Sequence, residues 1–518
     1  MVFDGWLETL GGGERQVLAA AAALREMGSV TVVSHRAIEW RDVVERAGLD
    51  LDQVRYRRVP ETPQLTGDDL VPGCDLLVNG THHSLVHAGG VPAIRFVYFP
   101  ARRCVRWIEV SGNLVRRVGL MLGAARESTG WYGAECSVAG RYRHSDGSGH
   151  ISVGGGGAVR FWLSAMGDGG REYTVVSAKG EQLGHGVAGT GGDFCPSPWI
   201  EIGNDVADVV LKSRATLFNS DGESRSVGIA LGSIEEKGSL LRAGFQLLTR
   251  RIVPLLGMWS ADEYSRLYAR ALGTYDVVTP NSRYTASWLE RRWGISGPVI
   301  EPPVISGGGL SGPKAPLIVS IGRFFSGGHN KKHLEMVRAF ENLCADGLVG
   351  WRLVLVGGVG QRPEDHAYFC EVERAARGSP IDLFPDADEQ TVCDLRDRAA
   401  LGWHATGYGE SGTDHPERFE HFGMAIAELM AAGAVPIVFD GGGLREIVEH
   451  ERNGYRWRTL DELCEYTMSL VRNGRRRVRF AAAAQQRAEL WSLGHYQRRI
   501  LAMTRDLIAS RKQRLIAR

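Results

Sequence analysis

Residues 422–432 of this 518-residue chain read FGMAIAELMAA, a segment in which almost every side chain is apolar. A helix that is apolar around its whole circumference must be buried, yet this one carries a carboxylate at Glu428. A buried charge has to be paired or hydrogen-bonded. Glu420 comes just before the first turn, where unpaired backbone N–H groups favour an anionic ligand. The segment therefore predicts a buried helix that holds one functional carboxylate and is preceded by another.

An α/β sheet accounts for the residues that follow this helix. The sequence AVPIVF at residues 434–439 has the length and composition of a fully buried strand, and the loop DGGG at residues 440–443 follows it. Ligands of open α/β sheets bind at the edge where the strands end. We therefore expect the binding site along this edge.

The arrangement of Glu420 and Glu428 around Phe422 and Gly423 resembles the donor-sugar site of retaining glycosyltransferases of family 4, the glycosyl transferases group 1. The resemblance implies an α/β GT-B fold, in which two Rossmann-like domains face each other across a cleft. It also implies that Glu428 binds the ribose of a nucleotide sugar, that Glu420 lies beside the transferred sugar, and that the helix start, including Met424, lines the donor site. The alternative is a surface helix with one capping and one solvated glutamate.

Cations follow the first strand of this second α/β region. Residues 316–322 read PLIVSIG as a strand, and Arg323, Lys331 and Lys332 lie in the loop before a helix at residues 333–342. Arginine binds phosphate oxygens as a planar fork and lysine as a point charge, so the loop suits a diphosphate. The family pattern matches Arg323 and Lys331, with Lys332 as the alternative cation. A basic surface loop is the competing explanation.

The next strand, at residues 351–357, ends in a glycine loop, and we place Gly357 at the donor. A dinucleotide fingerprint fails in this loop because Pro363 stands where its last glycine is needed. The acidic pair that ends at Asp388 looks like a metal-binding Asp-x-Asp pattern, but it precedes a helix expected at 389–400 and is better explained as an N-cap. We therefore expect no catalytic metal and no cofactor, only a UDP- or GDP-linked sugar as donor substrate.

A glycine run opens the first α/β region. Gly12 and Gly13 follow a very short apolar opening and lead into an alanine-rich helix at residues 16–27, with a strand at 30–34. Glycines ahead of a helix let the backbone approach a phosphate or a sugar closely, although a tight turn uses the same residues. In the resembled family a similar loop faces the diphosphate and the acceptor, which implies donor contacts for Gly12 and Gly13.

The strand at residues 94–99 ends in the sequence VYFP, where many relatives carry a histidine before the aromatic residue and the proline. Tyr98 occupies the position of that histidine, so the family's histidine role does not carry over directly. His82 and His83 follow the neighbouring strand at residues 75–79 and are candidates to orient the sugar or the acceptor from there. Solvated loop histidines are the plainer alternative.

Residues 103–125 have the pattern of a basic amphipathic helix. Its cations, together with the residue that precedes it, are Arg102, Arg103, Arg106, Arg116 and Arg117. Such a helix on the acceptor side can contact anionic lipid headgroups at a membrane surface. An ordinary solvated face is the favoured alternative, because the net charge of the chain is only +1.

The pattern changes between residues 128 and 236, where short alternating segments lie between glycine-rich turns. This pattern predicts an inserted antiparallel β-sandwich, and the segment resembles the β-sandwich modules of some bacterial glycan-assembly glycosyltransferases. Its aromatic residues either bind glycan from the surface or fill the core, and the core is the favoured role for most of them. These residues are Trp131, Tyr132, Tyr142 and Trp162.

The length and composition fit a globular protein of several domains, and a net charge of +1 gives no general attraction to nucleic acid. Eight cysteines are scattered with no CxxC pair, which argues against a zinc site or a disulfide framework and favours a reducing cytoplasm. The N-terminus has no signal-peptide pattern, and no apolar run has the length of a membrane span. We expect a cytoplasmic protein, with peripheral contact at the inner face of the membrane as an option.

The predicted domain order follows these changes in pattern. The helix at 283–293 and the strand before it return to the first α/β domain after the insertion, and a glycine-rich linker comes next. A last helix then crosses back in the resembled fold. The expected boundaries are 1–125 and 239–306 for the N-terminal Rossmann-like domain, 126–238 for the insertion, 307–315 for the linker, 316–490 for the C-terminal Rossmann-like domain and 491–518 for the helix and basic tail.

The residues and the resemblance together predict a retaining glycosyltransferase. It would move a sugar from a nucleotide diphosphate to a glycan or a lipid-linked acceptor in bacterial-type cell-surface polysaccharide assembly. Glu420, Arg323 and Lys331 are the expected catalytic residues. The alternatives are a non-catalytic glycan-binding protein that uses the β-sandwich, and a GT-B disaccharide phosphorylase that needs no nucleotide.

Overall fold

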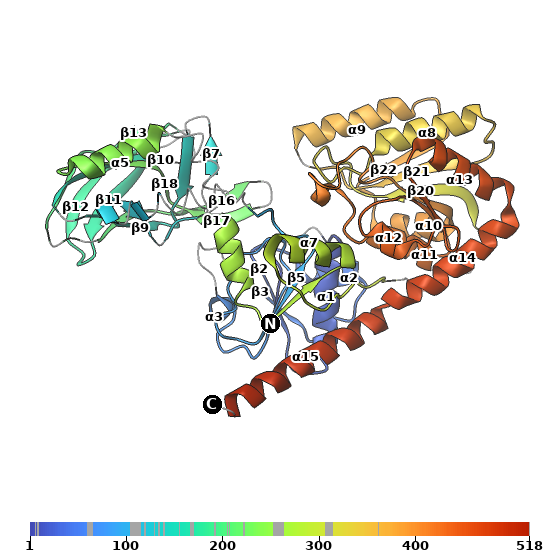
Figure 1. Ribbon diagram of the computed structural model, residues 1–518, viewed down its shortest axis with the longest axis horizontal. Coiled ribbons are helices and arrows are strands. Elements are labelled where there is room, and N and C mark those ends of the chain that lie inside the picture. Colours follow the sequence, from blue (N-terminus) through green and yellow to red (C-terminus); the bar gives the residue numbers. More distant parts are fainter. Residues whose placement is uncertain are drawn as a thin grey trace.

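The computed structural model describes the chain except for residues 6, 8–9, 60–65, 104–114, 116, 119–120, 129, 133–134, 138–139, 155, 166–169, 191–192, 205, 207, 221–222, 252–263, 306–313, 361 and 517–518. An N-terminal half (residues 1–103 and 264–305) lies between a β unit (residues 126–237) and a C-terminal half (residues 314–492) (Figure 1). Arg106, Arg116 and most of the predicted linker fall outside the described residues.

A parallel sheet with the strand order β19-β5-β4-β1-β2-β3 forms the centre of the N-terminal half. Its strands are β1 (Val2–Phe3), β2 (Thr31–Ser34), β3 (Arg55–Arg58), β4 (Leu77–Asn79), β5 (Ala93–Val97) and β19 (Val277–Pro280). The short opening of the chain is thus a central strand, and Val2 and Phe3 are fully buried. β19 comes from beyond the β unit and pairs with β5 at the edge of the sheet.

The helices of the N-terminal half are α1 (Gly12–Leu24), α2 (Trp40–Ala47), α3 (Gly67–Leu70) and α7 (Arg283–Trp293). α1 begins four residues before the predicted start and includes two glycines in its first turn. Glycine is a poor helix former, which is why the prediction started later. α7 has its predicted bounds, because Ser282 caps its first turn and Gly294 ends it in the left-handed conformation.

The β unit consists of the antiparallel strands that the alternating pattern predicted. One sheet has the order β13-β10-β18-β8-β7 with β14 also on β10, another has the order β12-β11-β15-β9-β6, and β16 pairs with β17. The strands are β6 (Arg126–Glu127), β7 (Glu135–Ser137), β8 (Gly140–His144), β9 (Ser148–Ser152), β10 (Gly157–Ala165), β11 (Arg171–Ser177), β12 (Gln182–Ala188), β13 (Cys195–Pro196), β14 (Ile200–Ile202), β15 (Asp208–Ser213), β16 (Thr216–Ser220), β17 (Glu223–Val227) and β18 (Ile229–Lys237).

Buried side chains from these sheets meet in one hydrophobic cluster that includes Phe161 and Leu211. Trp131 and Tyr132 are also buried, so they serve the interior and do not form an exposed glycan platform. The indole of Trp162 is half-buried and donates a hydrogen bond to Glu235 over 2.9 Å. Helix α5 (Leu240–Arg251) follows β18 and packs along the β unit (Figure 1).

The C-terminal half has its own parallel sheet, with the order β22-β21-β20-β23-β24-β25. Its strands are β20 (Ala315–Ile321), β21 (Arg352–Gly357), β22 (Ile381–Pro385), β23 (Ala399–His404), β24 (Val435–Phe439) and β25 (Tyr455–Trp457). The helices and short 3₁₀ turns are α8 (His333–Ala345), α9 (Pro363–Ala376), α10 (Glu389–Arg398), η2 (Pro416–Arg418), α11 (Met424–Ala431), α12 (Leu444–Ile447), α13 (Leu460–Arg472), α14 (Gly474–Ala488) and η3 (Glu489–Trp491).

One boundary in the C-terminal half differs from the prediction. The helix expected at 389–400 ends at Arg398, and Ala399 already begins β23. Alanine favours a helix locally, but here Ala399 and Ala400 are buried in a strand that pairs with β20 and β24, so tertiary packing overrides propensity. The Asp388 carboxylate accepts the backbone N–H of Thr391 at 2.7 Å, which confirms its predicted role as N-cap.

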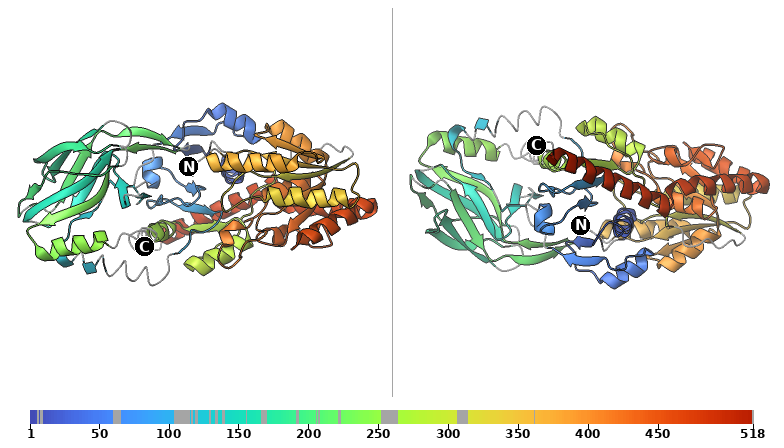
Figure 2. Two further views of the ribbon diagram at one scale, coloured as in Figure 1. Left: turned by 90° about the horizontal axis from the view of Figure 1, so that it is seen from above. Right: turned by 90° about the horizontal axis from the view of Figure 1, so that it is seen from below.

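Helix α15 (Leu493–Ile516) leaves the C-terminal half and runs along the N-terminal half to the chain end (Figures 1 and 2). It packs on α1, where the Tyr496 hydroxyl donates to the carbonyl oxygen of Gln16 at 2.9 Å. Arg511 pairs with Asp276 over 3.0 Å, so this residue of the basic tail is held by the protein itself.

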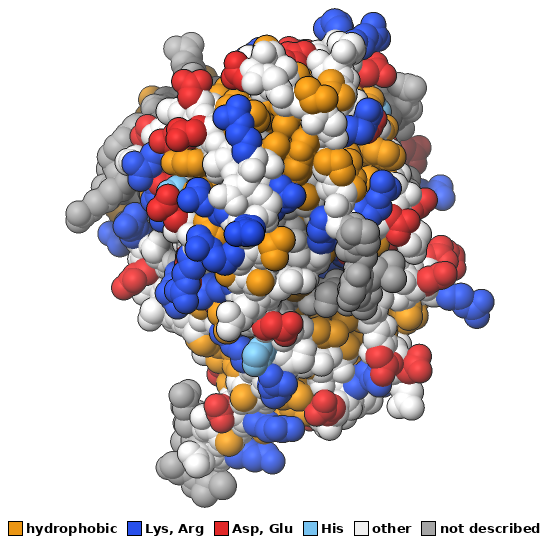
Figure 3. Space-filling view, turned by 90° about the vertical axis from the view of Figure 1, so that its right-hand side faces the viewer, with side chains coloured by type: hydrophobic (Ala, Val, Ile, Leu, Met, Phe, Trp, Pro, Cys, Tyr) orange, Lys and Arg blue, Asp and Glu red, His pale blue; other side chains and the backbone are white. Residues whose placement is uncertain are grey.

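The outer face of the C-terminal half carries Lys and Arg side chains that are interspersed with Asp and Glu (Figure 3). Within the described ranges, no helix has both the length and the apolar character needed to cross a bilayer.

Candidate active site

A partly buried ion pair lies where strands β20 and β23 end. The Lys331 ammonium is 2.7 Å from Oε2 of Glu420, and Nε2 of His404 lies 2.9 Å from the same oxygen. Lys331 comes from the loop after β20, His404 is the last residue of β23 and Glu420 precedes α11. The predicted pair Glu420 and Lys331 is therefore brought together, at the sheet edge where ligands of α/β sheets bind.

The charges in this cluster are fixed by its contacts. Burial opposes ionisation, but Lys331 and the His404 hydrogen bond outweigh it and hold the pKa of Glu420 well below its ordinary value. Burial lowers the pKa of His404, so its imidazole is neutral. A carboxylate only accepts hydrogen bonds, so Nε2 of His404 must be the donor, while Nδ1 accepts the amide of Thr406 at 3.4 Å. The cluster thus presents an ionised glutamate held by a lysine and a neutral histidine.

His404 and Gly322 were not predicted as site residues. A Cβ at Gly322 would lie 2.7 Å from Cγ of Lys331, so the glycine makes room for the lysine stem. Their positions in the sequence could have indicated them. His404 is the last residue of a buried strand and Gly322 directly follows another, at the ligand-binding edge of the sheet.

Lys332 and Arg323 lie apart from this cluster. Lys332 is 2.8 Å from Glu410, so it pairs with a different carboxylate from the one that Lys331 contacts. Arg323 is exposed, with its guanidinium carbon 5.5 Å from the centroid of the Phe325 ring. Gly357 packs on the backbone beside it, because a Cβ there would lie 2.2 Å from the carbonyl oxygen of Gly322.

Glu428 lies on α11, and its nearest cation comes from the opposite half. Its Oε1 is 3.9 Å from Arg15 of α1, and Arg15 also pairs with Glu389 of α10 at 2.5 Å. Burial raises the pKa of Glu428, while Arg15 and Arg396 oppose that rise. The charge expected to need a partner therefore has one, although Arg15 was not predicted as part of the site.

The start of α11 faces the glycine run of the N-terminal half. Gly423 has φ +108°, a backbone conformation that residues other than glycine rarely adopt. Phe422 beside it is buried. Met424 is the first residue of the helix, and a Cβ at Gly12 would lie 2.5 Å from its sulfur. The predicted residues Gly12 and Met424 are thus in direct proximity across the interface.

Tyr98 is part of the support for the glycine run. Its hydroxyl donates to the carbonyl oxygen of Gly13 at 2.9 Å, and its own carbonyl oxygen accepts from Thr285 at 2.9 Å. Burial holds the pKa of Tyr98 well above its ordinary value. In this arrangement the tyrosine hydroxyl is hydrogen-bonded to the backbone, and Tyr98 helps to position Gly13.

His82 and His83 stack on each other with ring centroids 3.8 Å apart, and His82 is 6.3 Å from the Tyr98 ring. Histidines that were not predicted lie on the opposite half. His421 stacks on Phe99 at 4.4 Å, and His329 is 5.0 Å from His421. Histidines from both halves therefore approach the interface close to Glu420.

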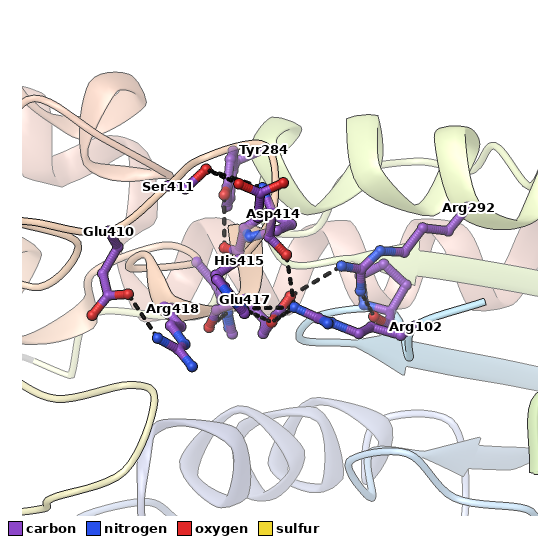
Figure 4. A network of polar contacts seen from close by, with 12 residues as sticks. Arg102, Tyr284, Arg292, Glu410, Ser411, Asp414, His415, Glu417 and Arg418 are labelled. Carbon is purple, nitrogen blue, oxygen red and sulfur yellow. Dashed lines mark hydrogen bonds and ion pairs between the residues drawn. The ribbon is translucent and has the colours of Figure 1, made fainter. Parts of the chain in front are cut away.

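Ion pairs join the halves beside this site (Figure 4). The Glu417 carboxylate accepts hydrogen bonds from Arg102 at 2.5 Å and from Arg292 at 3.0 Å. Arg102 also donates to the carbonyl oxygen of Asp414 at 2.7 Å. Arg102, which was grouped with a basic amphipathic helix whose face was expected to be solvated or to contact lipid, thus points to the C-terminal half. The Tyr284 hydroxyl adds a hydrogen bond to the carbonyl oxygen of Pro416 at 2.7 Å.

Helix α7 receives a second contact from the C-terminal half at its first turn. The Glu446 carboxylate accepts the backbone N–H groups of Arg283 at 2.9 Å and Tyr284 at 2.6 Å. Ser282 donates to the carbonyl oxygen of His421 at 2.6 Å. The structure therefore represents a closed arrangement of the halves.

Replacing Glu417 by glutamine is expected to favour separation of the halves, because Arg102 and Arg292 lose their shared charge partner. Burial raises the pKa of Glu417, but the hydrogen bonds from Arg102 and Arg292 outweigh it and lower the pKa from 4.5 to about 2. A lowered pKa means that the contact stabilises the closed form above pH 4.5 and weakens as the pH falls towards 2. Small-angle scattering should show a larger radius of gyration for Glu417→Gln at about pH 6, and the difference should shrink below pH 4.5.

The matched control is Glu373→Gln, which removes an exposed pair with Arg377 on α9 and should leave the radius unchanged. Equal radii for wild type and Glu417→Gln at about pH 6 would contradict a role of Glu417 in closure.

In the described part of the chain, no group of three or more His, Cys, Asp or Glu side chains is placed to hold a metal ion.

Comparison with known proteins finds a family similarity in the C-terminal half. The family model described as Glycosyl transferases group 1 matches residues 308–487. The GDP-Man:Man(3)GlcNAc(2)-PP-Dol alpha-1,2-mannosyltransferase of Dictyostelium discoideum is 25% identical over 271 residues, which are 47% of this chain and 50% of the relative. The chain thus aligns with half the length of that curated relative.

Two solved structures illustrate what the chain is similar to, and one of them supports the fold. HepE (Alr3699) of Anabaena, in complex with UDP-glucose, has a TM-score of 0.50 and 12% identity, and the match covers 97% of this chain and 98% of that one. A sucrose-phosphate synthase of Thermosynechococcus elongatus matches 48% of this chain and 62% of its own, with 18% identity and a TM-score of 0.39. Together with the paired parallel sheets, the match to HepE shows an α/β GT-B-like fold.

Proposed function

We propose that this protein is a retaining, metal-independent glycosyltransferase of family 4 that transfers a sugar from a nucleotide diphosphate to a glycan or lipid-linked acceptor. The observation that carries the proposal is the buried cluster of Lys331, Glu420 and His404 at the end of the C-terminal sheet. The match of this half to the glycosyl transferases group 1 model supports it.

The donor would lie between the start of α11 and the glycine run of α1. Ribose hydroxyls are natural donors to the Glu428 carboxylate, which would then exchange its distant partner Arg15 for direct hydrogen bonds. Gly12, Gly13 and Gly423 let these segments pack closely, because a Cβ at each would meet Met424, Tyr98 and Leu444 in turn. The free N–H groups at the start of α11 add a favourable field for negative charge.

Departure of the nucleotide diphosphate leaves negative charge on the phosphate and positive charge at the anomeric carbon. Lys331 would stabilise the first, and Arg323 would join it by turning inward from its exposed position. Glu420, kept ionised by Lys331 and His404, would lie next to the second. Pre-aimed charges in a closed cleft contribute more than the same charges in water.

The donor and the acceptor are proposed at the level of class. The Dictyostelium relative is named for GDP-mannose and a dolichol-linked glycan, and HepE was solved with UDP-glucose. GDP and UDP are therefore the first nucleotides to test. We propose a role in bacterial-type cell-surface polysaccharide assembly at the cytoplasmic side of the membrane, with the β unit as an inserted β-sandwich.

The test is thermal unfolding of the purified protein with UDP, GDP, ADP or inorganic phosphate. A ligand at about a hundred times its dissociation constant adds about 2.7 kcal/mol to the free energy of unfolding. We expect UDP or GDP to raise the midpoint and phosphate to leave it unchanged. A shift with phosphate alone would favour the disaccharide phosphorylase, and no shift with any nucleotide would contradict the proposal.

A further inference from the structure

A cavity of about 520 Å³ lies between the halves at the β19 edge of the N-terminal sheet, apart from the cluster around Lys331. One wall belongs to α7, which contributes Tyr284, Trp288 and Arg291. The guanidinium carbon of Arg291 is 5.2 Å from the centroid of the Trp288 ring, and this cation–π contact holds the charge at the wall. Cavities of this volume are in the range of small-molecule binding sites.

The opposite wall comes from the C-terminal half and is also cationic. Arg445 and Arg458 each place Nε 2.9 Å from the carboxylate of Asp440, which is 7% exposed. Asp440 thus orients both guanidinium groups at the cavity rim. A guanidinium has five N–H donors, so donors remain on Arg445 and Arg458 after Asp440 has been satisfied.

The charged side chains that line the cavity are Arg291, Asp440, Arg445 and Arg458, which leaves an excess of positive charge. Arg291 pairs with no carboxylate in the part of the chain that the structure describes. Phe419 and Phe439 add aromatic surface from the C-terminal half. A ligand that fits this lining has an apolar face for the aromatic rings and a negative charge for the arginines.

The cavity shares a wall with the proposed reaction site. Phe419 lines the cavity, and the next residue is Glu420, whose carboxylate points to Lys331 and His404. The carbonyl oxygen of Glu420 accepts the amide of Gly443, which fixes this segment against the loop after β24. A glycan in the cavity would therefore lie directly behind the backbone that carries Glu420.

We infer that this cavity is an acceptor subsite for a sugar that carries an anionic group, a phosphate ester or a uronic-acid carboxylate. This inference rests on the proposed transferase function, because the occupant is part of the acceptor. It adds a substrate class that neither the motif helix nor the comparisons specify: the accepting glycan carries a negative charge.

The test is ligand-observed NMR titration of the full chain, saturated with the nucleotide that gives the thermal shift so that the donor site is filled. The probes are glucuronic acid, glucose 6-phosphate, glucose and inorganic phosphate. We expect glucuronic acid and glucose 6-phosphate to bind at least tenfold more tightly than glucose. Equal binding of glucose would overturn the inference, and phosphate alone binding as tightly as glucose 6-phosphate would reduce the cavity to a simple anion site.

Arg291→Gln and Arg458→Gln should each weaken the binding of both anionic sugars by about tenfold, the loss of a charge-assisted hydrogen bond. The control is Arg452→Gln, a 78% exposed arginine that pairs with Glu449 away from the cavity lining. All variants should keep the nucleotide-induced thermal shift, which separates this test from that of the donor site. Anionic binding unchanged in both cavity variants would overturn the assignment.

Discussion

Lys331→Met is expected to lower kcat by about two to three orders of magnitude, the usual effect of removing one pre-aimed charge at a transition state. The lysine is the cation closest to Glu420 in the site, at 2.7 Å, and its stem is held in place against Gly322. Methionine keeps much of the stem volume and removes the charge. Initial rates of transfer, measured with the nucleotide sugar whose nucleotide gives the thermal shift, provide the test.

A loss of stability must be separated from a loss of catalysis. Lys331→Met leaves the Glu420 carboxylate, which is 13% exposed, without its cation. Breaking a buried pair in this way costs up to about 3–5 kcal/mol. The double variant Lys331→Met/Glu420→Gln has no unpaired charge and should recover most of that stability. Its free energy of unfolding is the readout, because Glu420 is itself an expected catalytic residue and its replacement lowers kcat by itself. A single variant Lys331→Met that stays as stable as the wild type and still loses kcat would show that the lysine acts on transfer.

Glu428→Ala is expected to weaken nucleotide binding by about a hundredfold or more. A carboxylate that accepts ribose hydroxyls forms charge-assisted hydrogen bonds, each of which contributes about 1.5–3 kcal/mol. At a nucleotide concentration that raises the wild-type unfolding free energy by about 2.7 kcal/mol, the variant should show almost no gain. Thermal unfolding with UDP and GDP measures this directly.

The matched control is Glu389→Gln, because Glu389 also contacts Arg15 but lies 43% exposed on α10. If Glu428 binds ribose, the Glu389 variant should keep nearly the full nucleotide shift. Equal loss in both variants would indicate that the nucleotide depends on the position of Arg15 and not on Glu428 itself.

Local signals in the sequence predicted many of the elements well. Ser282 and Gly294 mark both ends of α7, and the continuous apolar run marks α11. The parallel strands, each a short buried run before a loop, placed Glu420 and Lys331 at the same sheet edge. Such features depend on residues close together in the chain, and so a single sequence is enough to find them.

Contacts between distant segments were the part that could not be predicted. The cation nearest Glu428 is Arg15, more than four hundred positions away in the chain, and the Tyr98 hydroxyl is taken by Gly13. No periodicity or spacing links such pairs. Arg102 is a further case. The basic residues around it predicted an exposed helix face, but nothing in the sequence predicted its ion pair with Glu417 of the other half.

The contact of Glu446 with α7 connects catalysis to the integrity of a helix end. The first N–H groups of any helix have no acceptor within the helix, and those of Arg283 and Tyr284 find theirs on the other half. Separation of the halves during the proposed transfer cycle would expose these amides to water, and renewed contact would have to remove that water. We therefore expect the rate of turnover to depend on how quickly water binds to, and leaves, the backbone N–H groups at the start of α7.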